Sequence, residues 1–329
     1  MRATWYERTG PADDVIVSGE QPMPEPAPGQ VRIRLLASGV NPADCNRRRG
    51  AGYSMEAAFV IPNSDGAGIV DKAGAGVSGL NPGDRVWLYN GQRNGRNLGT
   101  AAEYIALDAD LVTLLPGNVP FEAGACLGIP CMTAHRCAFG GGPVTDKWVL
   151  VTGGGGAVGN YAIQLAKWGG ARVITTISTA VHAADAEAAG ADVILDRHAD
   201  DVRKQCLEFT GGRGVDRVVE VDFGGNLAVL VDVIAINGAI SGYASRGNPS
   251  PVLPFADLMR RNVTIEGVLL PTSPHAARRQ AQADIWRWLQ EGERLHRIAA
   301  TFPLAATAAA HKFVEAGAKR GTVVVQPAD

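Results

Sequence analysis

A glycine-rich segment near the middle of the chain gives the clearest chemical signal in the sequence. Five of the nine residues from 151 to 159 are glycine, and Gly154, Gly156 and Gly159 match the pattern G-x-G-x-x-G. In such a loop the first glycine allows a tight turn, the second lets a pyrophosphate approach the backbone, and the third lets the next helix pack closely. That helix presents free amides and a positive dipole end to phosphates.

We therefore predict a dinucleotide-binding loop, because an apolar strand precedes these glycines and a helical pattern follows them. A glycine-rich turn without a ligand is the alternative interpretation. The residues expected to form the phosphate cradle are Gly153, Gly154, Gly155, Gly156, Ala157, Val158 and Gly159.

The segment after this loop bears on the choice of coenzyme. An NAD site usually has Asp or Glu about 20 residues beyond the loop, on the ribose hydroxyls. This chain has Ser178 there and no carboxylate before Asp185. A carboxylate would repel a 2′-phosphate, so its absence favours NADPH. Ser178, His182 and Arg197 are the candidate contacts, although His182 and Arg197 are equally typical of solvated surface residues.

A parallel sheet is needed to position these residues. From about residue 121, apolar strands alternate with helical segments, and such β-α-β repeats predict a doubly wound α/β sheet covered on both faces. The first 120 residues instead carry short strands separated by turns, which predicts a compact, barrel-like β-rich domain. The strands expected in the α/β part are residues 148–153, 171–178, 191–196, 214–221 and 238–243.

Composition excludes several classes of function. The 329 residues are 46% hydrophobic and 19% charged, with a net charge of -2, so we expect neither nucleic-acid nor anionic-membrane binding. The N-terminus lacks a signal-peptide pattern and no apolar run approaches the length of a membrane span, so we expect a cytoplasmic protein. The five cysteines form no C-x-x-C unit, which indicates free thiols.

The order of several motifs along the whole chain resembles one known family. The chain is similar to the zinc-free quinone oxidoreductases, the zeta-crystallin-like group of the medium-chain dehydrogenase/reductase superfamily. The segments that carry the resemblance are GVNPADCNRRRGAGY (39–53), IPNSDGAGIV (61–70), NPGDRV (81–86), LGIPCMTAHRCAF (127–139) and GGGGAVG (153–159).

This resemblance implies a GroES-like catalytic domain over residues 1–122, completed by residues 266–329, and a Rossmann domain over residues 123–265. It implies homodimers or homotetramers that reduce quinones or activated alkenes by hydride transfer from NADPH. It also assigns cofactor contacts to further residues, namely Thr133, Gly242, Tyr243 and Ser245.

The resemblance also bears on metal and substrate. Zinc-dependent relatives have metal ligands where this chain has Asn41, Ser64 and Asp65. A catalytic zinc takes three Cys, His or carboxylate ligands, so we expect no metal. Without a Lewis acid, polarisation of the substrate falls to hydrogen-bond donors. The catalytic candidates are Asn41 and Tyr53, although Asn41 also suits a turn before proline and Tyr53 an ordinary loop.

Some positions depart from the family pattern. His182 and Asp196 replace a lysine and a tyrosine that contact the 2′-phosphate in relatives, which leaves the preference between NADPH and NADH open. Residues 47–49 are three consecutive arginines, which suit a solvated loop or a guide for an anionic substrate. The alternative functions are an enone or alkenal (enoyl) reductase, and a non-catalytic protein that binds NADPH or RNA.

Overall fold

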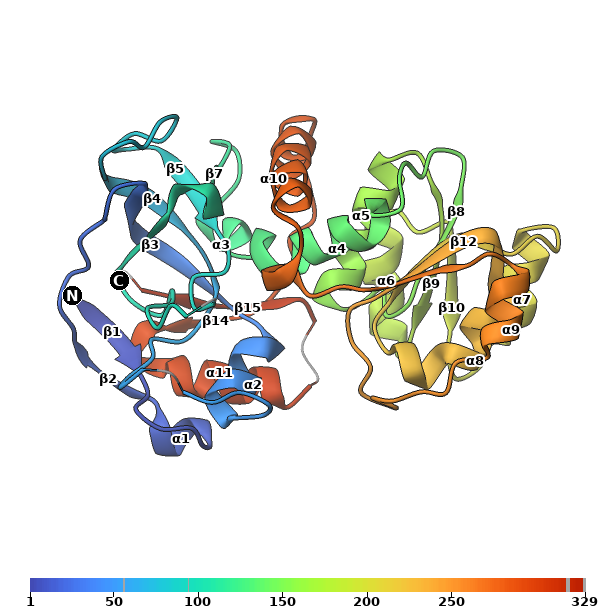
Figure 1. Cartoon of the computed structure of the whole chain (residues 1–329), viewed down its shortest axis with the longest axis horizontal. Helices are drawn as coiled ribbons and strands as arrows, with labels where there is room; N and C mark the ends of the chain where they lie inside the picture. The colour runs from blue at the N-terminus through green and yellow to red at the C-terminus, as the bar shows by residue number, and fades with distance from the viewer. Residues whose placement is uncertain (56, 94, 318–319, 328–329) are drawn as a thin grey trace. The chain divides into compact units, whose positions relative to one another are not determined.

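The computed structural model describes residues 1–55, 57–93, 95–317 and 320–327 (Figure 1). The chain divides into two compact units. Unit 1 comprises Met1–Ile129 and Gln282–Asp329, and unit 2 comprises Pro130–Ala281. The predicted domain boundaries, at 122/123 and 265/266, lie N-terminal to the boundaries between the two units, at 129/130 and 281/282. As boundaries between functional domains they stay a prediction.

Unit 1 is built on a seven-stranded, mostly antiparallel sheet with the order β14-β15-β3-β4-β5-β7, and β6 also pairs with β3. Its strands are β3 (Gln30–Val40), β4 (Asp65–Ala73), β5 (Arg85–Leu88), β6 (Tyr104–Asp108), β7 (Val112–Leu114), β14 (Ile298–Pro303) and β15 (Thr322–Gln326). A separate pair, β1 (Arg2–Trp5) and β2 (Val17–Glu20), is antiparallel. The helices and short helical turns are α1 (Ala12–Val15), α2 (Pro42–Arg49), η1 (Ala109–Leu111), α3 (Phe121–Gly124), η2 (Leu127–Cys131), η4 (Leu304–Ala306) and α11 (Thr307–Glu315).

Strand β3 shows why this sheet forms. Its apolar residues Val31, Ile33 and Leu35 alternate with polar ones and are fully buried, as expected where one face of a strand meets a core. The last strand, β15, pairs with β3 in the register Val323 to Val40. The C-terminal segment is therefore part of the same sheet as the N-terminal strands.

Unit 2 is a parallel sheet with the order β10-β9-β8-β11-β12-β13 (Figure 1). Its strands are β8 (Trp148–Val151), β9 (Arg172–Ile177), β10 (Val193–Asp196), β11 (Val215–Glu220), β12 (Ile234–Gly242) and β13 (Thr264–Gly267). Its helices are α4 (Met132–Phe139), α5 (Ala157–Trp168), α6 (Ala180–Ala188), α7 (Val202–Phe209), α8 (Phe223–Val233), α9 (Phe255–Arg260) and η3 (Leu270–Thr272). Helix α10 (His275–Gln290) contains the division between the units.

This strand order is that of the Rossmann fold, so the predicted fold class is confirmed. The order reverses direction between β8 and β11, and ligands of such sheets bind at the carboxyl ends of the strands beside that switch point. The core strands Val149–Val151 and Val218–Val219 are fully buried. Sequence periodicity was sufficient here because continuous apolar strands fit only a sheet covered on both faces.

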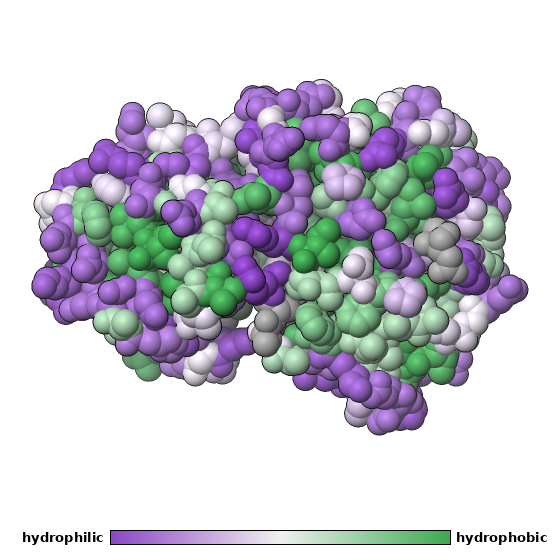
Figure 2. Space-filling view, turned by 180° about the vertical axis from the view of Figure 1, so that it is seen from behind, coloured by the Kyte–Doolittle hydropathy of each residue, from purple (hydrophilic) through white to green (hydrophobic). Residues whose placement is uncertain are grey.

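The surface and the cysteines give two further facts. No helix among the described residues is both long and apolar enough to cross a bilayer, and Figure 2 shows hydrophilic side chains over much of one face, with apolar groups in separate patches. The five cysteines form no disulfide, as the sequence predicts, and the structure shows that all five are buried.

Candidate active site

The glycine loop lies between β8 and α5, at the carboxyl end of the first strand of the Rossmann sheet. Gly153 has a φ of +70°, which favours glycine. A Cβ on Gly154 would lie 2.2 Å from Thr175 Oγ1, and one on Gly159 would lie 2.2 Å from the Gly153 carbonyl oxygen. These glycines are needed for the protein's own packing, in agreement with their roles in the sequence pattern.

Gly156 differs from these glycines because the position that a Cβ would occupy is almost free of neighbouring atoms. A Cβ there would meet only the Gly153 carbonyl oxygen, at 3.3 Å, and the residue is exposed. It is the N-cap of α5, with an extended backbone. Among the described residues, the amides of Ala157 and Val158 at the start of the helix have no acceptor. Free amides, a positive helix end and an open glycine together form a cradle for a phosphate group.

His182 is brought to this loop by α6. A Cβ on Gly155 would lie 2.3 Å from the His182 ring, so the imidazole packs against the loop and buries Gly155. Ser178 directly follows β9 and is exposed. Arg197 follows β10, is also exposed, and donates from Nε to His198 Nε2 at 3.3 Å. The structure thus places His182 against the cradle and leaves Ser178 and Arg197 at the ends of the neighbouring strands.

The sequence analysis did not single out Glu220, a buried carboxylate beside the loop. It ends β11, and its Oε1 accepts hydrogen bonds from the Asp222 amide at 2.5 Å and from Asn226 Nδ2 at 2.8 Å. Its Oε2 is buried without a partner among the described residues. Burial raises the pKa of Glu220. A charged residue at the end of an apolar strand was the signal that could have found it.

The other predicted cofactor residues lie in unit 2 as well. Gly242 ends β12 and pairs in register with Glu220. Tyr243 follows it, and the pKa of its phenol is raised by burial and by the nearby Cys137 and Glu220. Ser245 organises its own loop, accepting from the Gly224 amide at 2.9 Å. Thr133 lies on α4 and is buried.

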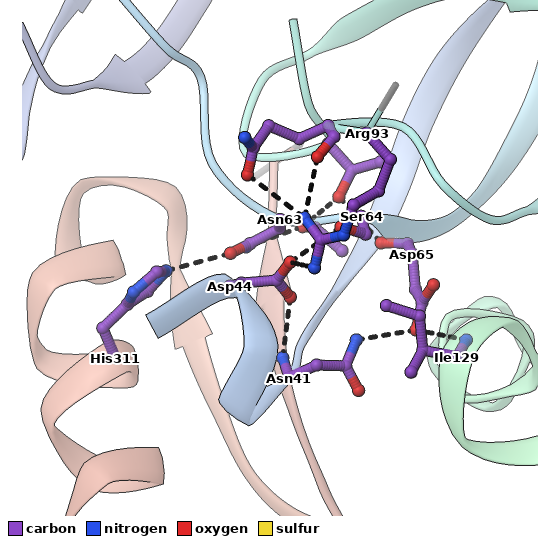
Figure 3. A network of polar contacts seen from close by, with 11 residues as sticks. Asn41, Asp44, Asn63, Ser64, Asp65, Arg93, Ile129 and His311 are labelled. Carbon is purple, nitrogen blue, oxygen red and sulfur yellow. Dashed lines mark hydrogen bonds and ion pairs between the residues drawn. The ribbon is translucent and has the colours of Figure 1, made fainter. Parts of the chain in front are cut away.

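Unit 1 holds a second group of polar side chains, centred on Asn41 and Asp65 (Figure 3). Asn41 is the N-cap of α2 and Asp65 begins β4. Asn41 Nδ2 donates to Asp65 Oδ2 at 2.7 Å, and the Ile129 amide donates to the same oxygen at 2.8 Å. Both side chains are buried, so the orientation of the Asn41 amide is set by Asp65.

Asp65 is held in an unusual state by this packing. It is fully buried, and its Oδ1 has no hydrogen-bond partner among the described residues. Gly128 leaves room for that oxygen, since a Cβ there would lie 2.1 Å from it. Burial, together with the charge of Asp44, raises the pKa of Asp65 to about 8. Asp65 is therefore a neutral acid at neutral pH.

Asp44 links this pair to the rest of the group. Its Oδ2 accepts from the Asn41 backbone amide at 2.9 Å, which caps α2. Its Oδ1 accepts from Ser64 Oγ at 2.7 Å and from Arg93 Nη2 at 2.8 Å. Asp44 and Arg93 are both buried, and a buried carboxylate of this kind requires such a partner. The sequence analysis named neither residue; the spacing of Asn41 and Asp44 is a capping pattern that points to one of them.

A chain of hydrogen bonds continues from this group to α11. Asn63 donates to Ser38 Oγ at 3.0 Å, and its Oδ1 lies 2.9 Å from His311 Nε2. Thr100 Oγ1 is 2.7 Å from Ser38 Oγ and donates to the Asp65 backbone oxygen at 2.7 Å. Burial lowers the pKa of His311 to about 4, so this imidazole is neutral. No local sequence signal identified His311.

Tyr53, the second predicted catalytic residue, has a different environment from Asn41. The residue is 42% exposed, and its ring stacks against the Arg47 guanidinium, whose carbon lies 4.8 Å from the ring centroid. The expectation of a solvated loop for the three arginines was wrong, because residues 47–49 form the last turn of α2. Arg48 is fully buried and pairs with Glu315 at 2.5 Å.

Two family models match the sequence. The model described as "Alcohol dehydrogenase GroES-like domain" matches residues 27–117, in unit 1. The model described as "Zinc-binding dehydrogenase" matches residues 157–290, which begins at the first residue of α5. The two matches therefore cover Asn41, Asp44 and Asp65 of unit 1 and the helix that follows the glycine loop.

Individual proteins show the same relationship. A quinone oxidoreductase from Sus scrofa is 30% identical over 295 residues, covering 88% of this chain and 86% of that protein. Two solved structures superpose over 99% of this chain. One, an NAD-dependent alcohol dehydrogenase, is 30% identical, is 99% covered and has a TM-score of 0.88. The other, a mycobacterial protein complexed with NADPH, is 29% identical, is 100% covered and has a TM-score of 0.86. The resemblance seen in the sequence is confirmed: the chain belongs to the quinone oxidoreductase family of the medium-chain dehydrogenase/reductase superfamily.

Proposed function

We propose that this protein is an NADPH-dependent oxidoreductase that transfers hydride to quinones or similar activated carbonyl acceptors, without zinc. The observation that carries the proposal is the open cradle at Gly156, with free amides at the head of α5. The mycobacterial relative complexed with NADPH and the quinone oxidoreductase from Sus scrofa support the choice of cofactor and acceptor.

The residues present fit a dinucleotide phosphate. The cradle offers donors without acceptors and space that a Cβ would fill, which is what a pyrophosphate requires. We assign the pyrophosphate to residues 153–159 and the 2′-phosphate to Ser178, His182 and Arg197. The nicotinamide half is assigned to Thr133, Gly242, Tyr243 and Ser245. NADPH supplies a hydride when bound, and the loop's part is to hold and orient it.

The donor set in unit 1 does not suit a catalytic zinc. Of the three positions that hold metal ligands in zinc-dependent relatives, Asn41 and Ser64 carry an amide and a hydroxyl, which are poor zinc ligands. Asp65 is a neutral acid engaged with Asn41. Among the described residues no group of three His, Cys, Asp or Glu side chains is arranged to bind a metal. We derive no step through a metal ion.

Asn41 is the residue that we assign to the substrate carbonyl. One of its two amide hydrogens is used on Asp65, and the other is available to an oxygen on which negative charge develops. The neutral state of Asp65 matters because an ionised carboxylate there would oppose that charge. Quinones are electron-poor, so one or two oriented donors suffice where a simple ketone would need a Lewis acid. Tyr53 is too exposed for this role and is assigned to substrate binding.

The test is a pair of measurements on the purified protein. Fluorescence titration with NADPH and NADH measures coenzyme binding, and NADPH oxidation is then followed with 9,10-phenanthrenequinone, a benzoquinone and an enone. We expect tighter binding of NADPH and turnover with the quinones. Turnover with the enone alone would shift the assignment to an enone reductase, and tight binding without turnover would indicate a non-catalytic protein.

We also propose a homo-oligomer formed through the edge strand β13. This strand ends the Rossmann sheet, so its outer hydrogen-bonding groups have no strand partner in the part of the chain that the structure describes. Apolar side chains are exposed around it, including Phe255 (70%), Met259 (61%) and Leu269 (56%), and exposed apolar groups of this size favour association. Analytical ultracentrifugation tests the proposal: a monomer at micromolar concentration would contradict it.

A further inference from the structure

A small cavity in unit 1 lies beside the last turn of α2. Its polar lining includes Tyr6, Arg47, Tyr53 and Gln92. Among the described residues that line it, none is acidic. The side chains come from the end of β1, from α2 and from two loops, so the cavity is created by tertiary packing. Of these four residues, only Tyr53 has been given a role so far, in binding the substrate.

Arg47 is the distinctive residue of this cavity. Its neighbours on α2 have carboxylate partners, since Arg48 pairs with Glu315 at 2.5 Å and Arg49 reaches the same residue at 3.4 Å. The Arg47 side chain forms no hydrogen bond or ion pair among the described residues, and its Nε is buried. Its one specific contact is the stacking on Tyr53. A half-buried guanidinium normally has an anionic or carbonyl partner, and here that partner is missing.

The electrostatic surroundings of Arg47 are unfavourable to its charge. Burial and the nearby charge of Arg93 both lower the pKa of Arg47. Arg93 is itself paired with Asp44 at 2.8 Å, and the more distant effect of Asp44 on Arg47 is smaller than the effects of burial and of Arg93. An anion in the cavity would supply the interaction that the protein does not provide.

Tyr6 gives an independent indication of a ligand. Its side chain is 2% exposed and lines the cavity, and its hydroxyl forms no hydrogen bond among the described residues. The hydroxyl oxygen is not one of the fully enclosed polar atoms, so it is open to the cavity and available to a group bound there. Gln92, also 2% exposed, adds an amide to the same wall, and its Oε1 lies 3.4 Å from Arg93 Nη1. Two side chains more than nine-tenths buried therefore face the space next to Arg47.

The size of the cavity limits the group that fits it. The room for water-sized groups is about 30 Å³, and one water molecule needs about 10 to 15 Å³ on that measure. The cavity therefore takes the two oxygens of a carboxylate but not an aromatic ring. The exposed ring of Tyr53 at its edge is available to the apolar part of the same molecule.

We propose that this cavity binds the carboxylate of an anionic substrate, with Arg47 as the charged donor and the Tyr6 hydroxyl as the second. The substrate class is then a carboxylated quinone or enone. This inference rests on the proposed function, which places the reacting carbonyl at Asn41. Helical rise puts Arg47 about 9 Å along α2 from Asn41, so the carboxylate is separated from the reacting carbonyl by several bonds.

The kinetic test compares 3-benzoylacrylate with its methyl ester, in which a methyl group removes the negative charge of the carboxylate. The ratio of the two kcat/KM values is measured with NADPH for the wild type, Arg47→Gln and Arg49→Gln. We expect Arg47→Gln to lower the carboxylate-to-ester ratio by about tenfold or more, the loss of one charge-assisted hydrogen bond. Arg49→Gln removes an exposed arginine of the same turn and should leave the ratio within about twofold.

The binding test does not require turnover. Calorimetry without NADPH, with 3-benzoylpropionate, an analogue that lacks the activated alkene, should show at least tenfold weaker binding to Arg47→Gln and several-fold weaker binding to Tyr6→Phe. Equal effects of Arg47→Gln and Arg49→Gln, or no effect of either, would overturn the proposal. Arg47-dependent binding without reduction of any acceptor would support the anion site and refute the proposed oxidoreductase activity.

Discussion

Substitution of Gly156 by alanine should affect NADPH binding much more than it affects the stability of the protein. The residue has a φ of -80° and a ψ of 164°, which alanine adopts readily. The new Cβ would meet the Gly153 carbonyl oxygen at 3.3 Å and nothing else within 4 Å. We therefore expect the variant to fold, with a loss of stability of about 1 kcal/mol or less, the usual cost of alanine at an N-cap.

The cost to NADPH binding should be much larger. The methyl group would occupy the space through which a phosphate reaches the amides of Ala157 and Val158, neither of which has an acceptor among the described residues. Displacing the phosphate weakens hydrogen bonds to a charged group, each worth about 1.5 to 3 kcal/mol. A total loss of about 2 to 4 kcal/mol corresponds to a Kd that is roughly 30- to 1,000-fold higher.

The assay is a fluorescence titration with NADPH, alongside thermal unfolding of the same samples. Gly117→Ala is the matched control, because Gly117 is exposed in unit 1 and has open space around it. It should change neither property. Gly159→Ala should differ from both, since its Cβ would lie 2.2 Å from the Gly153 carbonyl oxygen and disturb the loop itself. Binding of NADPH to Gly156→Ala within about threefold of the wild type would refute the cradle.

Three further predictions concern single residues. Because the pKa of Asp65 is raised to about 8, the infrared carbonyl band of a protonated carboxyl group should be present at pH 7, fade above pH 8 and be absent from Asp65→Asn. In the unfolded chain this carboxyl group loses its proton near pH 4. The stability of the wild type relative to Asp65→Asn should therefore fall as pH rises between about 4 and 8. For His311 the change of stability with pH has the opposite sign. Its pKa is lowered to about 4, so the free energy of unfolding should decrease as pH falls below about 6.5, by up to about 3 kcal/mol. Urea unfolding of His311→Gln should show a smaller decrease between pH 7 and 4.5. His182→Ala should weaken NADPH binding about three- to tenfold more than NADH binding in parallel titrations; equal changes would place His182 away from the 2′-phosphate.

Local patterns were sufficient for the fold and for the position of the glycine loop between a strand and a helix. The apolar strands of unit 2 are recognisable because each is buried on both faces, and the chain order of β-α-β units leaves few topologies. The glycines at 154 and 159 were informative for a similar reason. At each of these positions a Cβ would collide with a neighbouring atom. Only glycine fits there, so the presence of glycine in the sequence is itself evidence of the local geometry.

Protonation states and partners were decided by tertiary structure. Asp65 is a neutral acid because β4, α2 and the Ile129 backbone enclose it, and no local pattern distinguishes it from a solvated aspartate. His311 reaches Asn63 from 248 residues away.

The consecutive residues Arg47, Arg48 and Arg49 make the same point most simply. They are identical in type and adjacent in sequence, and the sequence by itself determined their charge and their place before a helix-ending glycine. Only tertiary structure determines that Arg47 lines a cavity, that Arg48 is buried in an ion pair with Glu315, and that Arg49 is exposed. Burial and partnership depend on segments that are distant in sequence, and these determine the free energy of a charge.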